Sequence, residues 1–236
     1  MKRTAIVLGL VCACGGGQVE APVVETVATA KPHKDGPHMR VEGQLGSIDE
    51  AATKKTFAKL ADQFQSCQTS GLKHIDYLSG DVKFFLRIGE DGKAKWGYLE
   101  KTTLGDIDTE KCLLSAAMNS AWPVPDGGEA EIQYDGLGFD PPSSARLPTE
   151  WPSDKIATVL GKHGEALNKC VESGKGAKFT VTAYVEPEGK VGKVQSVGVA
   201  TNTKEGAEQI DCIVSAVKTM KMPTPGSWAA KVAFQL

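Results

Sequence analysis

Six cysteines carry most of the chemistry that this sequence offers. Two of them, Cys12 and Cys14, lie in the stretch CACGGGQ near the N-terminus, and four are spread over the rest of the chain. A cysteine can bind metal, form a disulfide or carry a lipid, and the cellular compartment decides between these outcomes. The segments that carry the cysteines therefore have to be considered first.

The beginning of the chain has the layout of a secretory signal peptide. Lys2 and Arg3 precede an apolar run of about ten residues and then small residues. A spanning helix needs about twenty apolar residues. The stretch VCAC over residues 11–14 resembles the bacterial lipobox, whose last cysteine is acylated after cleavage. We expect a signal peptide over residues 1–13 and a lipid on Cys14. An ordinary signal peptide ending near Ala13 is the alternative, and nothing ordered surrounds the pair for a metal or redox role.

Export decides how the remaining chemistry is interpreted. Gly15 follows the acylated cysteine, where an aspartate would favour inner-membrane retention, so we expect a lipid anchor at the outer membrane, facing the periplasm. Four cysteines in an exported chain indicate disulfides, with three possible pairings; they are Cys67, Cys112, Cys170 and Cys212. Removing Lys2 and Arg3 leaves 25 basic and 29 acidic residues, so we expect no nucleic-acid partner.

Composition divides the chain into tether, halves and linker. Residues 14–50 are rich in Gly, Pro, Val and Thr without a sustained period, which predicts a flexible tether. A second Pro-rich break predicts a linker over residues 141–152. The segments 51–140 and 153–236, called the first and second half below, are then two small domains.

The two halves repeat one pattern of elements. Apolar residues spaced three or four apart predict a first helix over residues 53–70 and over residues 153–173, where Ser153 is a plausible N-cap. Alternating strands follow, DVKFFLRI and KFTVTAYV, each ending in a Gly-containing hairpin turn. A second strand, a helix with the second cysteine, Pro-x-Pro eleven residues after that cysteine, and a last strand complete each half.

One cysteine on each helix makes a bridge within each half the simplest pairing. The intervals are 45 residues, from Cys67 to Cys112, and 42 residues, from Cys170 to Cys212. Each bridge would join two helices on one face of a three-stranded antiparallel sheet. The fold class predicted is therefore α+β, with two tandem domains of the order helix–strand–strand–helix–strand.

The ordered features in each half resemble a known family. The first copy reads CQTSG, FFLRIGEDGKA and KCLLSAAMNSAWPVPDGGEAEIQYDGLGF, and the second reads CVESG, TAYVEPEGKV and DCIVSAVKTMKMPTPGSWAAKVAFQL. Each resembles the AgmX/PglI C-terminal type of domain, which is related to the TonB C-terminal domain. The resemblance implies a part in cell-envelope machinery, including motility or transport, and binding of partners by strand addition. The second copy departs from the first by Met222 in place of Trp122 and by the loss of one glycine.

Catalytic signatures are not found in the sequence. The four histidines have no partner at a recognisable motif spacing, and no nucleophile elbow, zinc helix, P-loop or dinucleotide fingerprint occurs. We therefore expect a non-enzymatic envelope protein without metal or small-molecule cofactor, acting as a scaffold or protein-binding component.

Two surfaces are candidates for that binding. The last strands, residues 129–135 and 231–236, are expected at sheet edges where a partner strand can add. The aromatic candidates are Trp122, Tyr134, Trp228 and Phe234, although aromatics in such positions also close small cores. The alternative function is a glycan-, peptidoglycan- or solute-binding lipoprotein, with Trp122, Tyr134 and Trp151 as stacking residues.

Overall fold

The computed structural model describes residues 39–42 and 46–236. The predicted signal peptide, Cys14 and most of the tether lie outside the described residues. The fold is α+β, as predicted, and the described residues all belong to one compact unit. No helix in the described part of the chain is long and apolar enough to cross a membrane.

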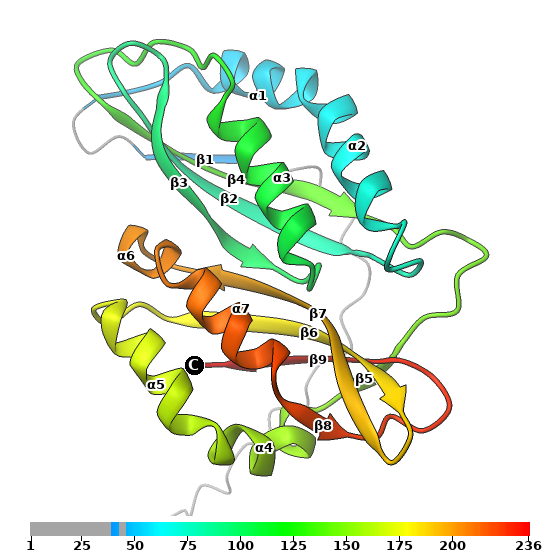
Figure 1. Cartoon of the computed structure of the whole chain (residues 1–236). Coiled ribbons are helices and arrows are strands. Elements are labelled where there is room, and N and C mark those ends of the chain that lie inside the picture. The colour runs from blue at the N-terminus through cyan, green and yellow to red at the C-terminus, as the bar shows by residue number, and fades with distance from the viewer. Residues whose placement is uncertain (1–38, 43–45) are drawn as a thin grey trace, which may run out of the picture. The chain divides into compact units, whose positions relative to one another are not determined.

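The first sheet has four antiparallel strands in the order β1-β4-β2-β3. Three helices lie on one of its faces (Figure 1). The strands are β1 (Met39–Glu42), β2 (Gly80–Ile88), β3 (Ala94–Thr102) and β4 (Ala130–Phe139), and the helices are α1 (Glu50–Lys59), α2 (Ala61–Gly71) and α3 (Ile107–Met118).

Local sequence explains these elements. Val82, Phe84 and Leu86 alternate into the core beneath the helices, as predicted. Gly92 takes φ 72° in the hairpin turn, a conformation that glycine adopts without steric cost. Asp106 begins α3 as an N-cap, because its side chain accepts the backbone N–H of Thr109.

The second sheet has five strands in the order β5-β9-β6-β7-β8. β5 pairs parallel to β9, and the remaining pairs are antiparallel. Its strands are β5 (Thr149–Trp151), β6 (Phe179–Glu188), β7 (Val191–Thr201), β8 (Lys221–Pro223) and β9 (Ala230–Gln235). The helical elements are η1 (Ser153–Ile156), α4 (Ala157–Lys162), α5 (Gly164–Ser173), α6 (Lys204–Ala207) and α7 (Ile210–Lys218).

The long first helix expected in each half is interrupted. In the first half it breaks at Leu60 into α1 and α2. In the second half it becomes η1, α4 and α5, with the last break at His163. Ser153 is the first residue of the 3₁₀ turn η1 and makes no capping bond, so its prediction as an N-cap is wrong. The apolar period persists across these breaks, which is why it does not reveal them.

The prediction of two similar tandem domains with three-stranded sheets is wrong. The sheets have four and five strands because each recruits a strand from a segment expected to be irregular. β1 comes from the predicted tether, and β5 comes from the predicted Pro-rich linker. β8 is a further strand in the second sheet only.

The halves also share a buried interface. Tyr184 of β6 is fully buried and belongs to the apolar core of the first half, whereas Ile107 of α3 belongs to that of the second. The Tyr77 hydroxyl donates to Gln195 Oε1 at 2.7 Å, and Lys231 Nζ donates to the Ser79 carbonyl at 3.0 Å. The face of the second sheet opposite its helices is therefore covered by the first half.

Candidate functional site

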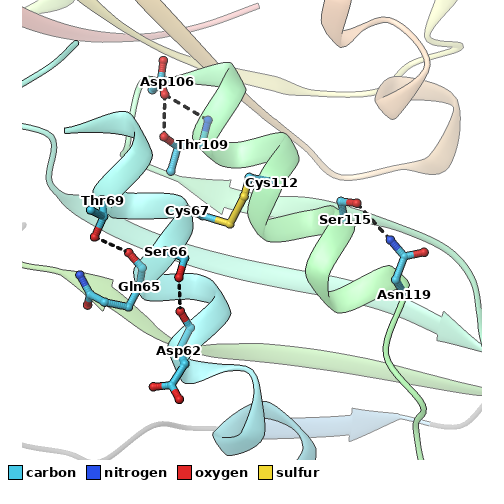
Figure 2. The surroundings of a disulfide bond; sticks show 10 residues. All are labelled: Asp62, Gln65, Ser66, Cys67, Thr69, Asp106, Thr109, Cys112, Ser115 and Asn119. Carbon is cyan, nitrogen blue, oxygen red and sulfur yellow. Dashed lines mark hydrogen bonds between the residues drawn. A yellow bond between two sulfur atoms is a disulfide. The ribbon is translucent and has the colours of Figure 1, made fainter. Parts of the chain in front are cut away.

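Two disulfides hold the helices that cover the sheets. Cys67 of α2 is bonded to Cys112 of α3, and Cys170 of α5 is bonded to Cys212 of α7, with Cα atoms 5.7 and 5.8 Å apart. Figure 2 shows the first bond between the two helices. The pairing within each half is thus confirmed. Disulfides persist in oxidising compartments, which is consistent with an extracytoplasmic protein.

Three of the four aromatic residues predicted to contact partners belong to the cores. Trp122 is buried, and its indole N–H donates to the Ala117 carbonyl at 3.1 Å. The Tyr134 ring stacks on Phe57 with centroids 3.8 Å apart, and Phe234 is buried in the second half. Trp122, Tyr134 and Phe234 therefore pack onto or into the cores. This is the second role that the sequence analysis allowed for these aromatic residues.

Trp228 is the fourth of these residues, and it remains half-buried at the surface. The guanidinium carbon of Arg146 lies 4.7 Å from the centre of its ring. Trp151, which was a stacking candidate for a glycan, is buried, and Lys155 Nζ lies 4.4 Å from its ring centre. The alternative function thus loses its three stacking residues to internal contacts.

The edge of the first sheet at β4 is already paired. β1 lies antiparallel along it, from Met39 opposite Tyr134 to Glu42 opposite Glu131. The chain itself therefore occupies the edge that the sequence proposed for partner binding in the first half. This pairing also demonstrates that the backbone of β4 presents a geometry to which an added strand fits.

The edge of the second sheet at β9 is only partly paired. β5 covers it from Ala230 to Val232 and then ends. Leu236 and Phe179 exchange both backbone hydrogen bonds, so they form a hydrogen-bonded pair of the β9–β6 ladder. Because such pairs alternate along antiparallel strands, the N–H and C=O groups of Ala233 and Gln235 point away from β6. The parallel register of β5 directs the Ala233 N–H to the Trp151 carbonyl. In the described structure the Ala233 C=O and both backbone groups of Gln235 therefore form a short open edge beyond β5.

The interface between the halves contains a cluster of buried polar side chains. Asp106 Oδ2 accepts from the Thr109 hydroxyl at 2.6 Å, and Asp106 Oδ1 accepts from the Ser196 hydroxyl at 2.6 Å. His74 Nε2 lies 3.5 Å from the same Oδ1 atom. Burial raises the pKa of Asp106, but the hydrogen bonds from Ser196 and Thr109 outweigh it and hold the pKa below its ordinary value.

This cluster lacks the geometry of a nucleophilic triad. Ser196 donates directly to the carboxylate of Asp106, whereas a triad serine is hydrogen-bonded to the histidine that activates it. Ser196 is also buried with 3% of its surface exposed, so a substrate cannot reach its hydroxyl. The arrangement joins α3 to β7 and has a structural role.

Among the described residues, one group of side chains has the composition of a metal site, and that group overlaps this cluster. His74, Asp106 and Asp108 have ligand atoms within 4.8 Å of one another. Both oxygens of Asp106 already accept hydrogen bonds, one of them from the first turn of α3. The N-terminus of a helix carries partial positive charge, which disfavours a cation there. The group is therefore best explained as the cap of α3.

Glu110 is a second buried carboxyl group at the interface. Its Oε1 accepts from the Thr102 hydroxyl at 2.8 Å and from the Gly105 N–H at 3.3 Å, and its Oε2 accepts from the Val199 N–H of β7 at 2.9 Å. Burial raises the pKa of Glu110 to about 7, against the opposing effect of these hydrogen bonds. A carboxyl group that titrates near neutral pH thus joins the halves.

A surface cavity lies beside Trp228, with walls from both halves. Asp76 and Tyr77 come from the loop after α2, Glu186 comes from β6, and Trp228 precedes β9. Of these residues, only Trp228 was singled out from the sequence. Asp76, Tyr77 and Glu186 belong to no sequence motif. The two segments that carry them are about 110 positions apart, and only the packing of the halves brings them together.

No family model, curated protein or solved structure matches this chain. The resemblance to the AgmX/PglI type of domain therefore stays a prediction.

Proposed function

We propose that this protein is a non-enzymatic, lipid-anchored component of the bacterial cell envelope that binds a protein partner by strand addition. The open edge of β9, formed by the Ala233 C=O and the backbone groups of Gln235, is the observation that supports it most directly. A partner in extended conformation gains main-chain hydrogen bonds at such an edge, and side-chain contacts then give specificity. The paired β4 edge supports the same mode of binding, since β1 already adds there.

The cellular location is part of the proposal. Cys14 would carry the lipid at the outer membrane, and residues 15–38 would connect it to the folded unit, which begins with β1, in the periplasm. The two disulfides support an oxidising environment. The resemblance of each half to TonB-related domains supports a scaffold or binding role in an envelope machine, such as one for motility or transport. No nucleic acid and no cofactor enter this proposal.

Gln235→Pro tests strand addition. Gln235 is exposed, and its N–H points away from β6 beyond the end of β5, so proline removes an open donor without removing a hydrogen bond to β6 or β5. Gln235→Ala is the matched control, because it removes the same side chain and keeps the N–H. We expect envelope partners captured with the wild type and with Gln235→Ala to be lost with Gln235→Pro. Equal capture by all three, with equal thermal unfolding midpoints, would refute strand addition at β9.

The anchor is tested separately by mass spectrometry of the mature protein. We expect an N-terminal peptide that begins with acylated Cys14 and lacks residues 1–13. With Cys14→Ala, the protein should leave the membrane fraction. An unmodified N-terminus at residue 14 would show an ordinary signal peptide instead.

A further inference from the structure

The cavity beside Trp228 combines aromatic walls with negative charge. It has a volume of about 360 Å³, and its lining includes the carboxylates of Asp76 and Glu186 but no lysine or arginine. Within the described residues, neither carboxylate takes part in an ion pair. Two acidic groups therefore face the same space without a positive partner.

The aromatic walls are held in place by hydrogen bonds outside the cavity. The Trp228 indole N–H donates to the Leu147 carbonyl at 3.1 Å, and the Tyr77 hydroxyl donates to Gln195 Oε1 at 2.7 Å. The two rings meet edge to face, with centroids 6.0 Å apart. Fixed walls lower the entropy that a ligand must overcome to bind.

The electrostatics of the cavity favour a cation. Burial raises the pKa of Tyr77, and the negative charges of Glu186 and Asp76 raise it further. The carboxylates thus impose a negative potential on the aromatic wall. A cation in the cavity would gain attraction from both carboxylates and from the exposed part of the Trp228 ring, whereas Tyr77 is 3% exposed and forms the floor.

The chain itself supplies an example of the matching chemistry. The Arg146 guanidinium carbon lies 4.7 Å from the centre of the Trp228 ring, a cation–π arrangement. Arg146 does not line the cavity, and in the described structure it makes no ion pair with Asp76 or Glu186. A guanidinium is planar, stacks on aromatic rings and offers five N–H donors to carboxylates.

We propose that this cavity binds an arginine side chain of the partner protein. The inference rests on the proposed function in one respect, that the arginine belongs to a protein partner. Asp76 and Glu186 would accept hydrogen bonds from the guanidinium, Trp228 would form the apolar wall beside it, and Tyr77 would form the floor. Because the carboxylates come from different halves, the site exists only while the halves are packed together.

The test uses Nα-acetyl-arginine methylamide as the probe and the full protein in detergent. Binding is followed by the NMR signal of the Trp228 indole N–H, which is assigned with Trp228→Phe. Nα-acetyl-citrulline methylamide is the neutral probe of the same shape. We expect the citrulline probe to bind at least about tenfold more weakly, because it lacks the charge.

Two double variants separate the cavity from general charge effects. Asp76→Asn with Glu186→Gln should weaken arginine binding by about tenfold or more. Asp135→Asn with Glu172→Gln changes the net charge equally at exposed positions that neither line the cavity nor adjoin a lining residue, and it should leave binding within about twofold of the wild type. Equal binding of the arginine and citrulline probes, or equal loss in the two double variants, would overturn the inference.

Failure of this inference can be told apart from failure of strand addition. Gln235→Pro should bind the arginine probe as the wild type does, because position 235 is at the end of β9 and does not line the cavity. Loss of partner capture with retained probe binding therefore concerns the edge of β9. Absence of probe binding with retained partner capture concerns the cavity alone.

Discussion

Glu110 should make the stability of this protein fall as the pH rises. Its pKa in the folded protein is about 7, against an ordinary value of 4.5, because it is buried between the halves. The folded state therefore binds the proton more tightly than the unfolded state. This contribution to the free energy of unfolding is fully present below about pH 4.5 and is lost as the pH rises through about 7.

The size of the effect follows from the two pKa values. Each pH unit between them is worth 1.36 kcal/mol, so the free energy of unfolding should fall by about 3 kcal/mol between pH 4 and pH 9. Asp106 and Lys231 also act on Glu110 electrostatically. Comparison of wild type and variant at each pH cancels their direct contributions.

Glu110→Gln removes the titration and keeps the shape. Its amide group must direct N–H donors toward the N–H of Gly105 or of Val199, which costs about 1 kcal/mol at pH 5. At pH 9 the variant should be about 2 kcal/mol more stable than the wild type, since it no longer buries a charge. The order of stability of the two proteins should therefore reverse between these pH values.

The assay is urea unfolding followed by tryptophan fluorescence from pH 5 to pH 9, with the disulfides intact. Glu172→Gln, an exposed position on α5, is the control and should follow the wild type. A wild-type stability that stays constant or rises from pH 5 to pH 9 would refute the reasoning. It would mean that the hydrogen bonds from Thr102, Gly105 and Val199 keep Glu110 ionised throughout.

Three further predictions concern the cores, the interface and the first sheet edge. Replacing Cys170 and Cys212 together by serine should lower the free energy of unfolding by about 4 kcal/mol, because the bond closes a loop of 42 residues. Urea unfolding measures this loss, and an unchanged unfolding midpoint would contradict the prediction. Ser196→Ala should cost about 2 kcal/mol, since Asp106 loses a buried donor, whereas a loss below a few tenths would show that the bond is unimportant. Replacing residues 39–42 by Gly-Ser-Gly-Ser should open the edge of β4 and increase self-association, measured by size-exclusion chromatography. An unchanged elution volume at high protein concentration would show that the unpaired β4 edge does not associate with other copies.

Much of the fold was predictable because local patterns determine it. Alternation placed Val82, Phe84 and Leu86 on one face of β2, and the core confirms that face. The cysteine on each helix predicted the correct pairing, because the two helices lie on the same side of one sheet. These features depend on residues close in sequence or on a repeated spacing.

The added strands were not predictable in the same way. β1 and β5 are only four and three residues long, so MRVE alternates over just two apolar residues and TEW has one, which is too short a pattern to predict a strand. They form because β4 and β9 offer unpaired backbone groups beside them. Such strands are determined by tertiary structure, so a search along the sequence finds tether and linker instead.

The packing of the halves was likewise hidden from sequence reasoning. Thr182 and Tyr184 alternate with apolar residues, a pattern that normally indicates a solvent-facing side of a strand. Both are buried because the first half covers them, and a Cβ atom at Gly105 would approach their side chains to 3.0 and 3.1 Å. The acidic cavity follows from this packing, which is why only Trp228 among its residues attracted notice.

The disulfides have a consequence for how the molecule can open. Each connects helices of the same half, so within residues 46–236 the main chain is the one covalent link between the halves. Side-chain hydrogen bonds and apolar contacts hold the halves together, and these are reversible on the timescale of domain motions. Separation and re-closure can therefore occur in an oxidising compartment without any thiol exchange, and each half would keep its helices clamped while apart.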